Sequence, residues 1–178
     1  MSKRTIFGSL AGGVAVLALA LVAAPAHAAE VPASPVAVVA SATPDSQPSI
    51  SELQAKAKAN AGEVSALRVA YPHCDDRIAY GSSFVYVPFV YASSNMNCIL
   101  EVGNNNRGVS TLQQALNSCY GKGLVVDGAF GNATYNALLQ VQSSLGVTVD
   151  GVYGPGTRHA MKFSSYYGGC YTGASIGL

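Results

Sequence analysis

The sequence predicts a mainly α-helical protein, in which a small three-helix bundle follows a short β-hairpin that disulfides tie in place. Three observations lead to this fold class. A nine-residue pattern occurs twice in the same register, glycine-terminated helical stretches accompany the two copies, and four cysteines are spread over residues 74–170. With 178 residues, the chain is long enough for one small domain with appendages, or for two very small domains.

The repeated pattern reads VDGAFGNAT at 126–134 and VDGVYGPGT at 149–157. The offset is 150 − 127 = 23 residues, and it holds at every shared position. Each copy is followed by a small and an apolar residue, Ala137-Leu138 and Ala160-Met161. Such agreement in register indicates a true internal repeat.

Each copy is predicted to form a tight turn that leads into a helix. An Asp-Gly pair makes a turn in which glycine takes a positive φ and the aspartate accepts hydrogen bonds from amides just ahead. The aromatic residue two positions later is expected to anchor the loop, and a first-turn threonine to satisfy free backbone donors. Proline suits the first position of a helix. The residues assigned to building the two loops are Asp127, Gly128, Phe130, Gly131, Thr134, Asp150, Gly151, Gly154, Pro155 and Thr157.

The spacing of apolar residues predicts three helices, over about 109–120, 132–145 and 155–163. Gly121 and Gly146 follow the first two and are expected to end them. The polar run 104–106 is expected to form a floppy entry loop. A bundle of about 65 residues has a marginal core, so disulfides should contribute to its stability.

The N-terminal part has the features of an export signal. Lys3 and Arg4 precede an uncharged, mostly apolar stretch at 6–24, and small residues lead to a cleavage site after Ala28. We predict a cleaved signal peptide at 1–28; the alternative is an uncleaved membrane anchor. Residues 29–50 are expected to be a disordered linker rich in alanine and proline.

Residues 51–70 predict a weak helix or a continuation of the linker, with Ser49 and Glu52 at the spacing of a capping box. Residues 71–98 predict a β-hairpin with strands at 77–80 and 84–91. Pro88 removes a ladder donor, so its strand should lie at an edge or break there. The hairpin aromatics are expected to pack on the helical module; the alternative is an exposed surface that stacks on sugars.

The four cysteines, Cys74, Cys98, Cys119 and Cys170, predict two disulfides because the chain is small and exported. Three connectivities remain open. We favour Cys98 with Cys119 and Cys74 with Cys170, the last residue lying in a C-terminal tail at 166–178.

Charge excludes one class of partner. The chain carries 10 Lys and Arg against 9 Asp and Glu, and removal of 1–28 leaves 10 − 2 = 8 positive charges against 9, a net charge of −1. Without a basic cluster, nucleic acid is not an expected partner.

No stretch after the signal is long and apolar enough to span a membrane, so no membrane association is expected after cleavage.

The doubled DGx[FY]GxxT pattern resembles that of the peptidoglycan-binding-domain-like family, a three-helix module of bacterial cell-wall enzymes. The resemblance covers about residues 99–165. Beyond the motif residues it includes Leu100, Gly103, Val109, Leu112, Gln113, Leu116, Ala137, Leu138, Gln142 and Gly146. Val141 departs from the family by replacing a common aromatic residue, and Asn132 by replacing a frequent proline.

The resemblance implies non-covalent binding of the glycan and stem peptide of peptidoglycan, usually to localise a catalytic domain. Together with the predicted signal peptide and the lack of a catalytic set, it leads us to expect a secreted, wall-associated, non-catalytic protein, with a cell-wall hydrolase as a further partner. Side chains near the repeated loops that could contact such a ligand are Asn132, Tyr135, Tyr153 and Arg158.

No catalytic constellation, metal site or cofactor is expected. The strongest reactive cluster is His73-Cys74-Asp75-Asp76, which could be written as a zinc site or a thiol–base pair and which we interpret as a disulfide cysteine in a polar loop. Two other functions stay open. One is an accessory or catalytic cell-wall hydrolase that uses the residues near His73–Asp76, and the other is a secreted protein-interaction or inhibitor module.

Overall fold

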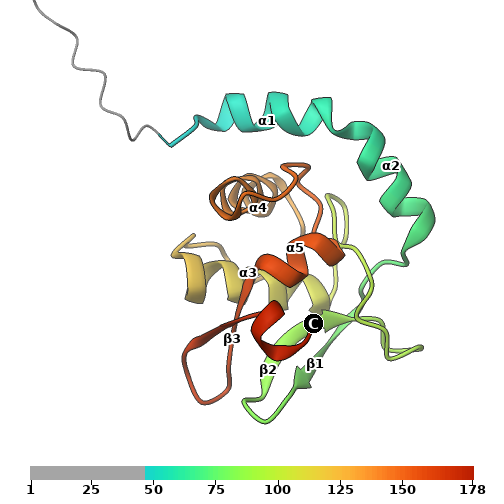
Figure 1. Cartoon of the computed structure of the whole chain (residues 1–178), viewed down its shortest axis with the longest axis vertical. Coiled ribbons are helices and arrows are strands. Elements are labelled where there is room, and N and C mark those ends of the chain that lie inside the picture. The colour runs from blue at the N-terminus through green and yellow to red at the C-terminus, as the bar shows by residue number, and fades with distance from the viewer. Residues whose placement is uncertain (1–46) are drawn as a thin grey trace, which may run out of the picture. The chain divides into compact units, whose positions relative to one another are not determined.

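The computed structural model describes residues 47–178, which form one compact unit (Figure 1). The predicted signal peptide and most of the predicted linker lie outside these residues. No helix within 47–178 is long and apolar enough to cross a membrane. The elements are α1 (Ile50–Ala59), α2 (Ala61–Ala70), β1 (Asp76–Tyr80), β2 (Val85–Phe89), α3 (Arg107–Tyr120), α4 (Asn132–Leu145), α5 (Pro155–Ala160), β3 (Lys162–Ser164), β4 (Cys170–Thr172) and the 3-10 helix η1 (Ala174–Ile176).

The three predicted helices are present as α3, α4 and α5. Gly121 and Gly146 end α3 and α4 in the left-handed conformation, with φ of 64° and 67°. Helix α5 ends at Ala160, earlier than predicted, because the chain enters strand β3 at Lys162.

Helix α3 begins two residues before the predicted start because Asn106 caps it. The Asn106 Oδ1 accepts a hydrogen bond from the Val109 amide at 3.1 Å, and its Nδ2 donates to the Cys74 carbonyl at 2.9 Å. Asn104 Oδ1 accepts from the Glu101 amide at 2.9 Å. The entry segment expected to be floppy is therefore held by its own asparagine side chains.

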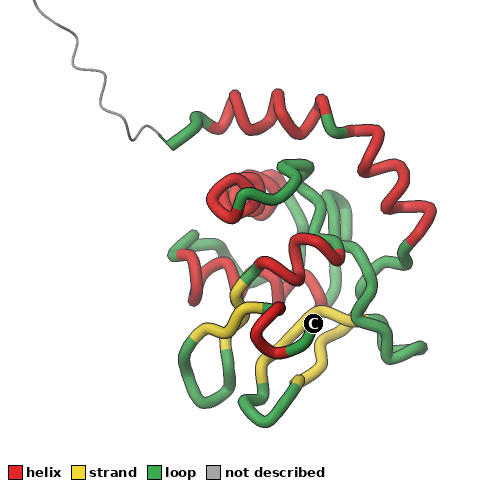
Figure 2. The backbone as a smooth tube through the Cα atoms, in the orientation of Figure 1, coloured by secondary structure: helices red, strands yellow, loops and turns green. Residues whose placement is uncertain are grey.

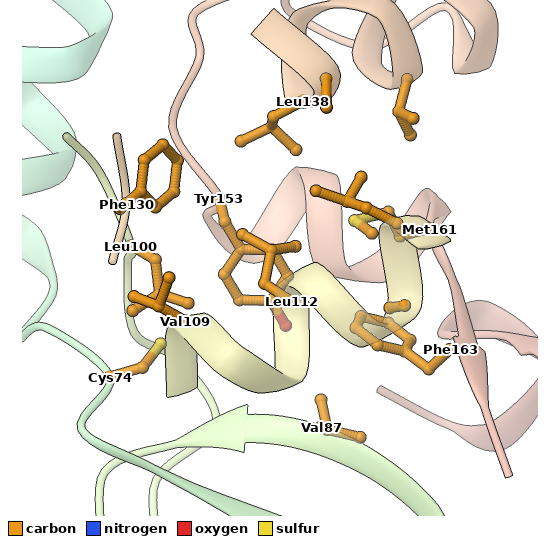
Figure 3. Packing of buried hydrophobic residues seen from close by; sticks show 14 of the residues in the cluster. Cys74, Val87, Leu100, Val109, Leu112, Phe130, Leu138, Tyr153, Met161 and Phe163 are labelled. Carbon is orange, nitrogen blue, oxygen red and sulfur yellow. The ribbon is translucent and has the colours of Figure 1, made fainter. Parts of the chain in front are cut away.

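The main core lies between these helices and the strands (Figure 3). Figure 3 shows Leu112 of α3 and Leu138 of α4 on facing sides of the core, with Met161 and Phe163 beside them. Leu116 of α3 belongs to the same buried cluster. Further buried members include Val85, Val87, Leu100, Val109, Phe130, Val141 and Tyr153. Burial of apolar area on this scale is the main stabilising contribution to the fold.

Two antiparallel hairpins pack beside α3 (Figure 2). Strands β1 and β2 pair from Asp76↔Phe89 to Tyr80↔Val85, close to the predicted bounds. Each strand of a two-stranded sheet has a free edge, so Pro88 is tolerated. Val85 and Val87 are buried, and among the hairpin aromatics Phe89 is buried whereas Phe84 and Tyr91 are exposed. The hairpin aromatics therefore divide between the two interpretations.

The second hairpin, β3 with β4, was not predicted. It pairs Lys162↔Thr172 through Ser164↔Cys170, and a bridge between Val85 and Ser165 joins it to the first hairpin. Its strands have three residues each, too short for an alternating pattern to identify them.

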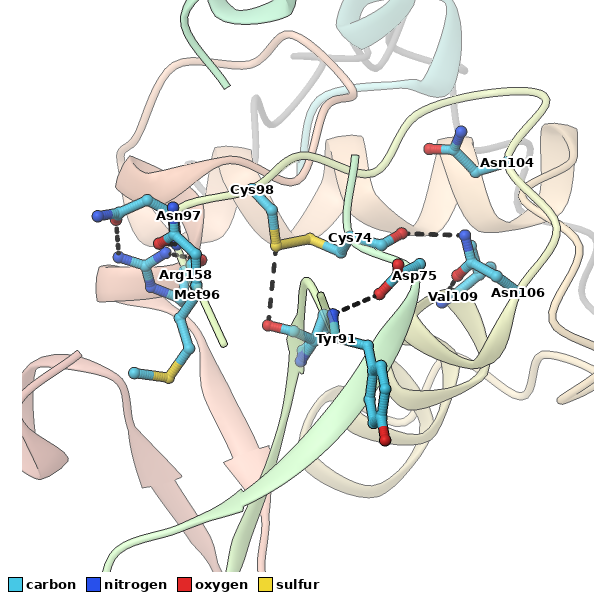
Figure 4. The surroundings of a disulfide bond; sticks show 12 residues. Cys74, Asp75, Tyr91, Met96, Asn97, Cys98, Asn104, Asn106, Val109 and Arg158 are labelled. Atoms are coloured by element: carbon cyan, nitrogen blue, oxygen red, sulfur yellow. Dashed lines mark hydrogen bonds between the residues drawn. A yellow bond between two sulfur atoms is a disulfide. The ribbon is translucent and has the colours of Figure 1, made fainter. Parts of the chain in front are cut away.

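Two disulfides are present, but the favoured pairing is wrong. Cys74 bonds Cys98 and Cys119 bonds Cys170. The first pair forms because the extended segments around them lie in parallel. The Cys74 amide donates to the Ile99 carbonyl, and the Ile99 amide to the Pro72 carbonyl, both at 2.9 Å (Figure 4 shows the surroundings of this disulfide). The second pair joins the last turn of α3 to β4.

The region expected to be one weak helix consists of two helices that meet at Asn60. The predicted capping box at Ser49 and Glu52 is confirmed. Helix α1 is firmly packed: Leu53 and Ala57 are buried against Leu139 and Val149. Figure 1 shows α1 running over α4, with α2 turning away along the other side of the molecule.

Candidate functional site

Each repeated loop closes around one glutamine side chain. In the first repeat, Gln113 of α3 donates through Nε2 to Asp127 Oδ1 at 2.8 Å, to the Ala129 carbonyl at 3.1 Å and to Thr134 Oγ1 at 3.1 Å. Its Oε1 accepts a hydrogen bond from the Gly128 amide at 2.9 Å. One side chain thus joins the turn to the start of α4.

Gln142 of α4 repeats this arrangement in the second loop. Its Nε2 donates to Asp150 Oδ1 at 2.6 Å, to the Val152 carbonyl at 2.9 Å and to Thr157 Oγ1 at 3.1 Å. Its Oε1 accepts from the amides of Asp150 and Gly151 at 3.2 and 2.9 Å. The two threonine hydroxyls therefore accept hydrogen bonds from the glutamines. The sequence had predicted instead that they would satisfy the free backbone donors of their helices.

The role of the glutamines was missed because they do not share the repeat offset. They are 142 − 113 = 29 residues apart, six more than the 23 of the loops. From Gln113 to the capping Gly121 there are eight residues, but only four from Gln142 to Gly146. The extra four residues are one further helical turn of α3, and the other two lie in the loop after it.

The predicted turn chemistry is present in both copies. Gly128 and Gly151 have φ of 77° and 72°. The aspartates accept from the amides two residues ahead, Ala129 and Val152, each at 2.9 Å. A side chain is excluded at Gly151 for a second reason, because its Cβ would lie 2.0 Å from Cε2 of a tyrosine ring.

The two aspartates have opposite electrostatic environments. Asp127 is exposed, and the hydrogen bond from Gln113, followed by that from the Ala129 amide, lowers the pKa of its carboxyl. Asp150 is buried, and this burial raises the pKa of its carboxyl in spite of the hydrogen bonds that it accepts.

Helices α1 and α2 cause this difference because they cover only the second loop. Val64 of α2 packs with Ile99 and Val152, and Leu67 lies at the edge of the same cluster. The Asn60 side chain, between the two helices, donates to the Val149 carbonyl at 2.9 Å. The second loop is thus the floor of a composite surface built from two distant parts of the chain.

Two grooves open along α2 where it crosses this loop. The larger, which we call the α2 groove, has a volume of about 680 Å³. It is lined from α2 and its C-cap by Glu63, Ala66, Leu67, Ala70 and Tyr71, and from the loop and α5 by Gly146, Val147, Thr148, Asp150, Val152, Gly154, Pro155, Gly156 and Thr157. The smaller, the Tyr135 groove, has a volume of about 310 Å³ and is lined among others by Lys58, Arg68, Glu101 and Tyr135.

The four side chains expected near a ligand are placed in different environments. Asn132 is exposed at the start of α4, and half-buried Tyr135 lies over Gly151 in the smaller groove. Tyr153 is fully buried in the core. Arg158 is 7% exposed and donates to the Met96 carbonyl and to Asn97 Oδ1 at 2.8 Å. Of the four, only Tyr135 lines a groove.

The side chains of the cluster His73–Asp76 are engaged in structural contacts within the protein. Cys74 is oxidised in its disulfide, which removes the nucleophile of a thiol–base pair. Asp75 Oδ1 accepts from the Tyr91 amide at 2.8 Å, and Asp76 Oδ1 lies 3.4 Å from Arg107 Nη1. Within residues 47–178, no group of three or more His, Cys, Asp or Glu side chains could hold a metal ion.

His73 instead takes part in tying α2 to the module. Its Nε2 lies 3.1 Å from Glu101 Oε1, and Arg68 of α2 holds the same carboxylate, with Nη2 2.6 Å from Oε2. Burial opposes ionisation of Glu101, but the hydrogen bonds from Arg68 and His73 outweigh it and lower its pKa.

Comparison with known proteins agrees with the resemblance found in the repeats. Residues 105–161 match the family model described as a putative peptidoglycan binding domain. No curated protein matches the chain. Among solved structures, the peptidoglycan-binding protein from Clostridioides difficile in complex with glutamine hydroxamate is 29% identical, with a TM-score of 0.34. That match covers 40% of this chain and 42% of the other, so the chain spans less than half of that protein's length. Residues 105–161, which hold the two glutamine-closed loops, are thus similar to the putative peptidoglycan binding domain family.

Proposed function

We propose that this protein is exported and binds bacterial cell-wall peptidoglycan without catalysing a reaction on it. The observation that carries the proposal is the family match over the module that contains both loops. Export is inferred from the signal-like segment 1–28, and the two disulfides suit an oxidising compartment.

The α2 groove is the surface that we assign to the ligand. Its walls are mostly apolar, with Leu67, Val147 and Pro155 among them, and its polar groups are few, such as Glu63 and Thr148. Concave sites of this size and composition are typical of small-ligand and peptide binding. A stem peptide of small residues joined by amides matches such a groove in polarity, since it offers apolar side chains to the walls and amides to the few polar groups.

The chemistry of the grooves supports a non-catalytic role. Asp150 is the one acidic group common to both, and it is committed to Gln142 and to the Val152 amide. The α2 groove holds one further carboxylate, Glu63, which comes from helix α2 and not from the repeated loop that holds Asp150. The protein would therefore localise itself, or a partner hydrolase, on the wall.

The test is sedimentation of the chain from residue 29 onward with insoluble peptidoglycan. Gly156→Trp should reduce the bound fraction strongly because the added ring projects into the α2 groove, where a Cβ added at this glycine would meet open space. Ala133→Trp is the matched control, since 156 − 133 = 23 places it at the same position of the first repeat, where it is exposed and lines neither groove.

Two outcomes would contradict the proposal. Wild-type protein that stays in the supernatant would exclude peptidoglycan as the ligand, and equal loss in both tryptophan variants would exclude the α2 groove. Clearing of cell walls in a zymogram, abolished by His73→Ala, would show a hydrolase instead of a binding protein.

A further inference from the structure

Three exposed aromatic rings lie together at the tips of the two hairpins, away from both grooves. Phe84 comes from the turn of the first hairpin, and Tyr166 and Tyr167 from that of the second. We call them the hairpin-tip cluster; their exposed fractions are 47%, 69% and 73%. The Tyr167 ring contacts Phe84 at 5.8 Å and Tyr166 at 5.2 Å between centroids, nearly perpendicular to each. None of the three lines a groove.

The backbone beneath these rings is fixed. The Tyr166 amide donates to the Phe84 carbonyl at 3.1 Å, and the Ser165 hydroxyl to the Ser83 carbonyl, so the two turns are bonded to each other. The Cys119–Cys170 disulfide ties the same hairpin to α3. Figure 1 shows the two hairpin turns side by side at the lower end of the view. The rings are therefore presented from a preorganised base.

Phe84 occupies its position at a conformational cost. Its φ is 47°, in the left-handed region that favours glycine, although a glycine would close this turn without strain. Burial does not explain the choice of residue, since about half of the ring is exposed. Strain retained for an exposed ring is typical of a site where that ring contacts a ligand.

The chemistry around the rings selects the class of ligand. Segments 81–86 and 163–173 contain no charged residue, and the turn of the first hairpin carries hydroxyls at Ser82 and Ser83. An uncharged surface of aromatic faces and hydroxyls complements a neutral polyol, in which apolar C–H faces alternate with hydroxyl edges. Perpendicular rings make a stepped surface that suits successive sugar rings of a chain.

We propose that the hairpin-tip cluster is a second binding site, for the pyranose rings of an extended, uncharged polysaccharide. It goes beyond the proposed function because it neither uses the α2 groove nor requires a stem peptide.

The test uses the chain from residue 29 onward and two neutral probes, chitohexaose and cellohexaose. Binding is followed by calorimetry and by tyrosine fluorescence, which is readable because the chain contains no tryptophan. Loss of two stacking rings in Tyr166→Ala/Tyr167→Ala should weaken binding by about tenfold or more. The double Tyr→Phe variant should retain most of it. Tyr91→Ala removes another exposed tyrosine, outside the cluster, and should leave binding unchanged.

Phe84→Gly separates a binding role from a structural one. It should keep or raise the melting temperature because it relieves the positive φ, and it should weaken hexasaccharide binding. Gly156→Trp, which fills the α2 groove and is followed by calorimetry because it adds a tryptophan, should bind the hexasaccharides like wild type. Failure here and failure of the peptidoglycan test are therefore distinguishable.

Three results would overturn the proposal: no binding of either hexasaccharide by the wild type, equal binding by the double alanine variant, or a loss in Tyr91→Ala as large as in that variant. Self-association of the wild type that Tyr166→Ala/Tyr167→Ala abolishes would also overturn it, since the occupant would then be a second copy of the chain.

Discussion

The two repeats share a sequence pattern and a glutamine-centred loop, yet one loop is open to solvent and the other lies beneath two helices. Asp127 is exposed with a lowered pKa, whereas Asp150 is buried with a raised pKa. Their hydrogen bonds to glutamine and to the amide two residues ahead are the same. The motif therefore builds the loop, and the cover decides its electrostatics.

The covering contacts arise from positions where the repeats differ. Seven residues before each glutamine stand Asn106 (113 − 7) and Tyr135 (142 − 7). Asn106 caps α3 and only its main chain lies against Gly128, while the large Tyr135 ring lies against Gly151. Three residues before each glutamine stand Ser110 and buried Leu139, and only the leucine gives α1 an apolar surface to pack on. The second copy thus presents an apolar surface on which α1 packs, and the first copy lacks it at the same position.

The largest expected contrast comes from removing the two glutamines. Gln142→Ala should lower the free energy of unfolding by about 3 kcal/mol, because it leaves several buried donors and acceptors unpaired. Gln113→Ala should cost about 2 kcal/mol, since water reaches exposed Asp127 and replaces part of the lost bonding. Urea unfolding measures both, with Ser118→Ala at an exposed position of α3 as a surface control. Equal losses of unfolding free energy in the two variants would show that covering the second loop with α1 and α2 does not affect its stability.

Detaching α1 should act on the second repeat alone. Leu53→Ala removes the buried contact with Leu139 and Val149 and should cost about 2 kcal/mol. Because water then gains access to the second loop, the pKa of Asp150 should fall toward its ordinary value while that of Asp127 stays unchanged. A carboxyl carbon NMR titration reads both groups in one sample. Val69→Ala, at a 91% exposed site of α2, should change neither stability nor pKa.

A smaller, stabilising effect is expected from making the repeats more alike. Tyr153 and Phe130 are equivalent, since 153 − 130 = 23, but the Tyr153 hydroxyl is buried without a hydrogen-bond partner among residues 47–178. Burial also raises the pKa of Tyr153. Tyr153→Phe should raise the unfolding free energy by about 1 kcal/mol, by removing an unpaired polar group. The reciprocal Phe130→Tyr should destabilise; stabilisation by that change would contradict the equivalence.

The smallest contrast is one of pH dependence. The lowered pKa of Asp127 means that its carboxylate stabilises the fold above the ordinary value of 3.8, and this contribution is lost as pH falls through the folded pKa. For Asp150, whose pKa is raised, the contribution is complete below 3.8 and is lost as pH rises through the folded pKa.

Asparagine variants test these opposite signs by melting temperature. At neutral pH, Asp127→Asn should lower the melting temperature, and Asp150→Asn should leave it unchanged or raise it. The difference should shrink near pH 3 as both wild-type groups gain protons. A fall of equal size in both variants at neutral pH would show that Asp150 is held as a stabilising carboxylate.

Much of the second half of the fold followed from local patterns. The bounds of α4, the left-handed glycines after α3 and α4, and the Asp-Gly turns were all predicted, because turn and cap chemistry acts within a few residues. The candidate ligand residues were harder to choose. Tyr153 and Arg158 follow the second turn closely in sequence, but both point into the protein.

By itself, the sequence determined the repeat, the family of the module and the local form of its loops. Tertiary structure alone decided the disulfide pairs, the burial of Arg158 against Met96 and Asn97, and the packing of α1 and α2 over the second loop but not the first. The reason is the range of the interactions. A turn or cap is stabilised by neighbours in the chain, whereas pairing, burial and groove shape depend on which distant segments lie against each other.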